Sequence, residues 1–210
     1  MLGTQSRLSP LDNEVIVLAS ASPRRSRLLT RAGVKYRVIP ANIREERLPG
    51  EQPEALAARL AREKARSVAQ RVGILPRRLV LGSDTVVALA DEVFGKPDDP
   101  EHAVQLLRRL VGRTHRVITG VAVVDSASGT LREATVAARV SMRPASDAEI
   151  RAYVATGEPL DKAGAYAIQG RGQHLVSKLE GSRSCVIGLP VEEALALLEE
   201  SIRDRTEESR

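Results

Sequence analysis

Aromatic side chains are scarce in this sequence of 210 residues, which contains one phenylalanine, three tyrosines and no tryptophan. Proteins that hold single-stranded nucleic acid commonly stack its bases on aromatic rings, and this chain has few rings to offer. Because the apolar fraction is still 42%, the core must be built from Leu, Val, Ile and Ala. Length and composition together predict one compact α/β unit or two closely joined lobes.

Cysteine and long apolar runs are also lacking. The single cysteine, Cys185, excludes an internal disulfide and a metal site made of several cysteines, and it fits a reducing compartment. Residues 1–13 hold no apolar segment typical of a secretory signal, and no run approaches the ~20 apolar residues of a membrane span. We therefore expect a cytoplasmic protein without a membrane partner. A single domain is predicted over 14–203, with flexible extensions at 1–13 and 204–210.

Several common catalytic motifs are absent. The chain has no Walker-type Gly-Lys-Ser/Thr loop, no glycine fingerprint for dinucleotides, no His-Glu-x-x-His pair and no nucleophilic serine between glycines. His102, His115 and His174 show no paired metal-ligand spacing. Cys185 is better explained as a small packing residue than as a nucleophile. These absences exclude the enzyme classes that depend on those motifs.

Lysine is rare as well, with only five lysines among the 32 basic residues. The net charge is +5, but the arginines are dispersed among 27 acidic residues and form no basic block, so no specific nucleic-acid partner is expected. Where arginine is used so freely, a retained lysine indicates a compact ammonium that acts on a phosphate oxygen. Local context favours this role for Lys64, Lys96 and Lys162, whereas Lys35 and Lys178 are explained as surface residues.

The clearest functional pattern that is present follows a short apolar run near the N-terminus. The run Val15–Leu18 predicts a buried strand, and Ser22 followed by Pro23 predicts the N-cap and first turn of a helix. Free N–H groups and the positive end of the helix dipole favour an anion there. Cations normally avoid this position, so Arg24 and Arg25 indicate an anionic partner such as phosphate. The alternative is a capped surface helix whose arginines are solvated.

A second pattern places a carboxylate between two apolar runs. The runs Leu79–Leu81 and Val86–Leu89 predict strands that flank Gly82–Thr85. A carboxylate where an apolar strand meets a glycine, here Asp84, is typically presented at the edge of a sheet. A rigid acid in such a place can hold Mg²⁺ or take a proton from water. Glu45, in an acidic loop before the second helix, is a candidate second carboxylate for a divalent metal. The alternatives are an ordinary structural turn and a solvated loop acid.

Periodicity and turn residues predict the remaining elements, including a long β-hairpin that marks a second lobe. Expected helices cover 22–31, 53–71, 100–111, 146–154 and 190–202. Expected strands cover 15–18, 35–39, 117–124, 131–142 and short stretches near Tyr166 and Leu175.

Short motifs spread over most of the chain support one interpretation; they are Leu18–Arg25, Arg59–Ala65, Ser83–Val87, Gly95–Pro97, Gly112–His115, Thr119–Ala122, Thr156–Pro159, Asp161–Tyr166, Ile168–Gly170 and Gly188–Pro190. Together they resemble the Maf family of nucleoside triphosphate pyrophosphatases, also described as Maf-like septum-formation inhibitors. The resemblance implies a Maf/ITPase-like α/β fold, with a twisted mixed β-sheet flanked by helices and two lobes around a central cleft. It also implies a divalent cation, Mg²⁺ or Mn²⁺, and hydrolysis of a nucleoside triphosphate to the monophosphate and pyrophosphate.

The resemblance further implies roles for particular residues. Asp84 matches the proton acceptor of the family, and Arg25, Thr85 and Gln169 match positions linked to base choice. The patterns Asp-Thr-Val-Val and Ile-Gln-Gly resemble the branch that acts on dTTP and UTP.

These observations lead to a hypothesis in which the phosphates of a nucleotide lie across the helix start at Ser22. The predicted substrate-binding residues are Ser22, Arg24, Arg25, Thr85, Lys162 and Gln169. The predicted catalytic residues are Asp84, which activates water, and two lysines that hold phosphate oxygens, Lys64 and Lys96. The predicted ligands for Mg²⁺ or Mn²⁺ are Asp84 and Glu45. Gln169 is expected to read the edge of a pyrimidine, and a homodimer is expected.

Two segments depart from the family pattern. Asn42–Glu45 replaces a stretch usually rich in acids, which weakens the loop as a metal site and leaves Glu45 as its candidate ligand. Further on, Arg183 and Cys185 replace a usual tyrosine and asparagine, a change that would bear on substrate preference if the segment lines the cleft. Two alternative functions stay open. One is the same chemistry on another nucleotide such as 7-methyl-GTP, and the other is a non-enzymatic regulator of cell division that binds nucleotide or nucleic acid.

Overall fold

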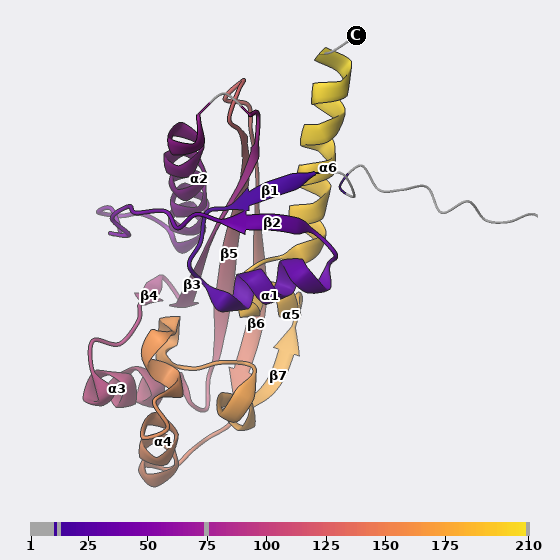
Figure 1. The fold of residues 1–210 in the computed structure, drawn as a ribbon. Helices are drawn as coiled ribbons and strands as arrows, with labels where there is room; N and C mark the ends of the chain where they lie inside the picture. Colours follow the sequence, from indigo (N-terminus) through magenta and orange to yellow (C-terminus); the bar gives the residue numbers. More distant parts are fainter. Residues whose placement is uncertain (1–10, 12–13, 74–75, 209–210) are drawn as a thin grey trace, which may run out of the picture.

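The computed structural model describes residue 11 and residues 14–73 and 76–208. Their strands form one mixed sheet (Figure 1) from β1 (Val15–Leu18), β2 (Lys35–Val38), β3 (Leu79–Leu89), β4 (Glu92–Phe94), β5 (Thr114–Asp125), β6 (Leu131–Met142) and β7 (Val176–Glu180). Their helices are α1 (Pro23–Arg31), α2 (Pro53–Val72), α3 (Pro100–Leu110), α4 (Asp147–Val154), α5 (Arg183–Ile187), α6 (Val191–Glu208) and the 3₁₀ helices η2 (Glu158–Asp161), η3 (Ala163–Ala165) and η4 (Gly170–Leu175).

The strand order is β2-β1-β3-β5-β6-β7, with β4 added to β3. Strand β1 is parallel to β2 and β3, and the remaining pairings are antiparallel. Helix α2 covers one face of the sheet, and α1 and α6 cover the other (Figure 1). The predicted α/β fold, with a mixed sheet flanked by helices, is confirmed.

Strand β3 is buried on both faces, because successive side chains of a strand point in opposite directions. Leu79 and Leu81 pack on one face with Leu29 of α1 and Leu198 of α6. Val80 packs on the other face against the alanine-rich side of α2. This strand is therefore held in place from both sides before it reaches the polar residues that follow.

The separation into two strands expected at Gly82–Thr85 is wrong, because β3 continues through these residues without a break. A Cβ atom on Gly82 would overlap the carbonyl oxygen of Ala61 in α2. The glycine thus lets a helix approach the sheet closely and does not turn the chain. Asp84 consequently lies in the middle of a central strand, not at the edge of the sheet.

A second lobe, made of β4, α3, α4 and the three 3₁₀ helices, lies at the end of the β5–β6 hairpin opposite its turn (Figure 1). Its core includes Phe94, Leu107, Ile150 and Leu175. The first lobe is the part built from β1, β2, α1, α2 and α6. The predicted hairpin and second lobe are both confirmed.

One strand prediction in the second lobe is wrong. Tyr166 follows η3 and belongs to no strand, since Gly164 and Ala165 before it have φ angles of +68° and +57° that turn the chain tightly. Strand β7 begins at Val176, directly after the residue near which a strand was expected.

Helix α6 runs to Glu208, past the helix end predicted near residue 202, so residues 204–208 of the predicted tail are helical. Asp204 pairs with Arg132 at 2.6 Å, and Arg205 pairs with Asp125 at 2.7 Å, so both ion pairs tie the helix end to the β5–β6 hairpin. Sequence periodicity alone does not detect such long-range pairs.

The predicted N-terminal extension falls almost entirely outside the described residues. Of residues 1–13, the structure describes Leu11, which is 7% exposed and packs into the core of the first lobe. Within the described part of the chain, no helix combines the length and apolarity needed to cross a bilayer.

Candidate active site

A cavity of about 860 Å³ lies between the two lobes, a size typical of small-molecule sites. Strand β1 pairs with β3 at Val80 and Leu81, and β4 pairs with β3 from Val87 to Leu89. The cavity opens between these two pairings. Asp84, Thr85 and Val86, between these pairings, line the cavity. The cleft implied by the family resemblance is therefore present.

All the site residues predicted from the sequence line this one cavity; they are Ser22, Arg24, Arg25, Glu45, Lys64, Asp84, Thr85, Lys96, Lys162 and Gln169. They come from segments far apart in the chain. The structure therefore assembles the predicted set, and the contacts within it distinguish the individual residues.

The start of α1 forms part of the cavity wall, with Ser22 at the N-cap and Pro23 in the first turn, as predicted. The Ser22 side chain makes no capping hydrogen bond, and the first turn contains no acid. The first N–H groups of the helix are thus left to an external acceptor, and an anion suits them best.

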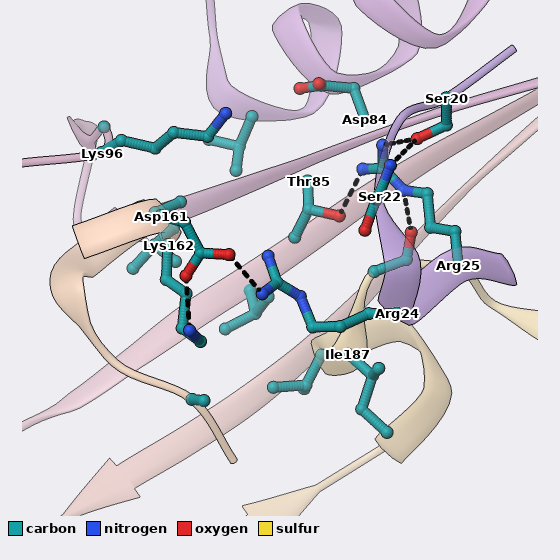
Figure 2. Close-up of a pocket in the computed structure, with 18 of the residues that line it drawn as sticks. Ser20, Ser22, Arg24, Arg25, Asp84, Thr85, Lys96, Asp161, Lys162 and Ile187 are labelled. Atoms are coloured by element: carbon teal, nitrogen blue, oxygen red, sulfur yellow. Dashed lines mark hydrogen bonds and ion pairs between the residues drawn. The ribbon is translucent and has the colours of Figure 1, made fainter. Parts of the chain in front are cut away.

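Arg25 is half-buried and ties three segments of the chain together. Its guanidinium donates hydrogen bonds to the Gly188 carbonyl at 2.7 Å, the Ser20 hydroxyl at 3.0 Å and the Thr85 hydroxyl at 3.3 Å (Figure 2). Burial lowers the pKa of Arg25, while the nearby Asp84 carboxylate opposes that change. Arg25 is well placed to hold the cavity wall in shape, and a phosphate would have to share its donors with these partners.

Arg24 lines the cavity and forms a bridge between the lobes. Its guanidinium donates to Asp161 at 2.9 Å, and the Lys162 ammonium pairs with the same carboxylate at 2.5 Å (Figure 2). Lys162 also donates to the carbonyl of Glu158. The sequence prediction assigned no role to Asp161, although an acid beside a proposed phosphate-binding lysine is a signal for such a pair.

The centre of the site is a buried lysine between two carboxylates. The Lys64 ammonium lies 2.6 Å from Asp84 and 2.6 Å from Glu45. The side chains of Lys64 and Asp84 are 8% and 10% exposed, whereas that of Glu45 is 48% exposed. Direct contact between Lys64 and a phosphate would require the ammonium to leave both acids.

The two carboxylates differ in their affinity for protons. Burial raises the pKa of Asp84, and the charges of Lys64 and Arg25 offset only part of that effect. Burial acts on Glu45 in the same direction, but its hydrogen bond from Lys64 lowers the pKa of Glu45 overall. Asp84 is therefore the better proton acceptor of the two.

Three other predicted residues occupy separate parts of the cavity wall. Lys96 is exposed, and its side chain extends into the cavity from the second lobe (Figure 2). Thr85 bonds to Thr119 at 3.0 Å as well as to Arg25. Gln169 is half-buried at the N-cap of η4. The ammonium group of Lys96 can therefore move toward a bound phosphate, whereas that of Lys64 is held by two carboxylates.

The segment that departs from the family pattern lies beside the cavity. Cys185 is buried and its thiol contacts the backbone of β5 and β6, which confirms its packing role. Arg183 donates to the Ile168 carbonyl at 3.3 Å, next to Gln169. Of the residues that follow, Val186 and Ile187 line the cavity.

A divalent cation fits the donor set without a complete protein cage. No group of three or more His, Cys, Asp or Glu side chains suited to a metal is found in the described residues. Asp84 and Glu45 nevertheless both reach one point, the Lys64 ammonium. Mg²⁺ is commonly held by one or two carboxylates together with substrate phosphates, and this pair matches that pattern.

A family model described as Maf-like protein matches residues 15–201. The chain belongs to this family. The membership predicted from the motifs is thereby confirmed, and the matched range includes every predicted site residue.

Relatives of known description share about half of their residues with this Maf-family chain. A dTTP/UTP pyrophosphatase from Geobacter sp. (strain M21) is 49% identical over 90% of this chain and 96% of its own length. The proteins of that description from Myxococcus xanthus (strain DK1622) and Escherichia coli O157:H7 are 51% and 50% identical, over 90% and 87% of this chain and 93% and 91% of their own lengths.

A solved structure was also found, a nucleoside-triphosphatase described as a dITP/XTP pyrophosphatase from Mycobacterium abscessus. It is 16% identical, covers 90% of this chain and 97% of its own, and has a TM-score of 0.42.

Proposed function

We propose that the protein is a nucleoside triphosphate pyrophosphatase that hydrolyses dTTP and UTP to the monophosphate and pyrophosphate. The observation that carries the proposal is the buried Asp84 carboxylate, which shares a cavity with the open start of α1 and with Lys96 and Lys162. The names of the relatives support the same reaction and the same substrates.

The phosphates bind across the start of α1, where backbone N–H groups, Arg24, Lys96 and Lys162 supply positive charge. Asp84 accepts a proton from a water molecule that attacks the α-phosphorus. The bond between that phosphorus and the bridging oxygen breaks, and pyrophosphate leaves. Lys64 holds Asp84 in place and balances its charge.

Asp84 and Glu45 would hold Mg²⁺ or Mn²⁺ together with the phosphates. When bound, the cation would neutralise charge that develops on the phosphate oxygens. Replacing Glu45 is therefore expected to raise the metal concentration needed for half-maximal activity.

The base lies against the opposite wall, where the Gln169 amide both donates to and accepts from a pyrimidine edge. Thr85, which Thr119 and Arg25 hold in place, lines the same cavity. When the nitrogen of the Gln169 amide faces the O4 carbonyl and its oxygen faces the N3–H, the amide pairs with uracil or thymine. A site that holds the amide in this orientation rejects cytosine, whose N4 amino group and N3 present the opposite pattern.

The test is a hydrolysis panel with dTTP, UTP, dCTP, dGTP and 7-methyl-GTP, with Mg²⁺ or Mn²⁺ and released pyrophosphate as readout. Preference for dTTP and UTP supports the proposal. Preference for 7-methyl-GTP would overturn the substrate assignment. No turnover, combined with salt-sensitive binding to nucleic acid, would favour the non-enzymatic regulator.

The proposal extends to a housecleaning role in the cytoplasm and to a homodimer. The single cysteine supports a reducing location. Fractionation of cells and light scattering of the purified protein test these two points separately.

A further inference from the structure

Gln169 lies between two 3₁₀ helices, η3 and η4, in a stretch without regular backbone pairing. Short segments of this kind open at lower free-energy cost than a central strand. Its side chain can select a base only if something else holds the backbone still. The surrounding contacts identify what does.

Glu158 holds the segment on its C-terminal side. One oxygen of its carboxylate accepts the backbone N–H of Gly172 at 2.9 Å, and the other accepts that of Arg171 at 2.9 Å. The Tyr153 hydroxyl donates to the same carboxylate at 3.0 Å. Two backbone donors just beyond Gln169 are thus fixed by one side chain.

Tyr153 holds the segment on its N-terminal side. Its hydroxyl oxygen accepts the backbone N–H of Ala167 at 3.3 Å while it donates to Glu158. The two side chains therefore bracket Gln169, with bonds two residues before it and two and three residues after it.

The two glycines that follow Gln169 are explained by these contacts. Gly170 has φ of +73°, and a Cβ atom there would lie 2.7 Å from the Glu158 carboxylate. A Cβ atom on Gly172 would overlap the Tyr153 hydroxyl. The segment packs directly on the two side chains, and larger residues would push it away.

The charge state of the pair suits this role. Burial tends to raise the pKa of Glu158, but the N–H groups of Arg171 and Gly172 outweigh it and lower that pKa overall. Burial raises the pKa of Tyr153. The carboxylate therefore stays ionised and the phenol stays protonated, the states that these hydrogen bonds require.

We infer that Glu158 and Tyr153 form a positioning pair that holds Gln169 for selection of the base. The inference rests on the proposed function. The carbonyl of Glu158 also accepts from Lys162, so the same residue connects the base wall with a phosphate-binding lysine.

The test compares Glu158→Gln and Tyr153→Phe with the wild type. An amide keeps one acceptor but presents a donor to a backbone N–H, and phenylalanine removes a single oxygen atom. Each variant should lower kcat/KM for dTTP by about 5- to 30-fold and leave that for dCTP within about 2-fold, so that the ratio of the two falls. Tyr153→Phe keeps the ring in place and serves if Glu158→Gln does not fold.

Glu149→Gln is the matched control. Glu149 likewise accepts from a backbone N–H, that of Ser146 at 2.8 Å, and it pairs with Arg143 on the surface of the second lobe. Its loss should lower the melting temperature without changing the dTTP to dCTP ratio. A fall of that ratio in the control equal to that in Glu158→Gln would overturn the inference.

A double variant separates positioning from general damage. In a Gln169→Leu background, Glu158→Gln should lower the dTTP to dCTP ratio no further, because its effect acts through Gln169. Equal losses for all nucleotides, or an undiminished second loss, would overturn the pair alone. A wild-type enzyme without preference for dTTP would overturn the proposed function and the pair together.

Discussion

The two walls of the cavity are built in different ways. The wall proposed to face the phosphates, here called the phosphate wall, takes Arg25, Lys64 and Asp84 from α1, α2 and β3, which are regular elements packed into the core. The base wall takes Gln169 from a segment held by side-chain bonds from Glu158 and Tyr153. In the proposed function, chemistry common to all nucleotides is thus placed on rigid backbone, and selection of the base is placed on backbone fixed by a few contacts.

This difference has a consequence for mutation. Opening a central strand requires loss of packing on both faces of the sheet, whereas the base wall can shift when one or two hydrogen bonds change. Substitutions on the phosphate wall should therefore reduce turnover of every nucleotide. Substitutions on the base wall should change the ratio between nucleotides.

The largest expected effect is on the phosphate wall. Asp84→Asn keeps the size of the side chain but removes the proton acceptor, so kcat should fall by about 10²- to 10⁴-fold for all nucleotides while the fold survives. Pyrophosphate release and circular dichroism measure the two quantities. Asp98→Asn, at an exposed carboxylate, is the control, and near-normal activity of Asp84→Asn would remove that residue from the mechanism.

Acid should distinguish the two lobes. His115, at the base of the second lobe, bonds to Tyr166 at 2.7 Å, and burial lowers its pKa from 6.5 to about 4. The unfolded chain thus binds a proton at His115 at higher pH than the folded chain. The contribution of neutral His115 to the free energy of unfolding is therefore present above pH 6.5 and is lost as the pH falls toward 4. The free energy of unfolding should decrease by about 3 kcal/mol over this range.

Urea unfolding between pH 7 and 4 measures this loss of stability. In His115→Gln the stability should change much less over the same pH range, because an amide does not titrate.

In the first lobe, burial tends to raise the pKa of Asp125, but hydrogen bonds from Arg77 and Arg205 lower that pKa to about 2. Its contribution should persist until the pH falls below 3.8, the ordinary value. At pH 5 the hydrogen-exchange protection factors, which correct for the slower intrinsic exchange at acid pH, should fall in α3 and α4 before they fall in α2. The reverse order would contradict this assignment.

The third effect is on the base wall. Gln169→Leu leaves the polar edge of uracil or thymine without its partner, so kcat/KM for dTTP and UTP should fall by about 10- to 100-fold, with a smaller change for poor substrates. The hydrolysis panel measures it. A uniform loss across all bases would place Gln169 with the phosphates and erase the contrast between the walls.

The smallest effect tests the preference for lysine on the phosphate side. Lys96→Arg replaces a compact ammonium with a planar fork, and activity should fall by about 10-fold for all nucleotides. Lys35→Arg, on the exposed edge strand β2, should change nothing. If the two variants behave alike, the argument from unequal use of lysine and arginine fails.

The sequence by itself determined the local elements and the membership of the site. Ser22 with Pro23 marks the start of α1, and Ser146 with Glu149 forms the capping box of α4, because caps depend on residues close in the chain. The predicted site residues also share one cavity. Their residue types already reflected the charge of a phosphate and the polar edge of a base.

Tertiary structure decided how those residues are coupled. Gly82 lets α2 lie close against β3, and Lys64 meets Asp84 and Glu45 because a helix, a strand and a loop converge. The hydrogen bonds that Tyr153 makes with Glu158 and with the backbone of Ala167 likewise connect residues that belong to different local sequence patterns. Hydrogen bonds and burial between distant segments depend on the packed fold, so no local sequence pattern encodes them.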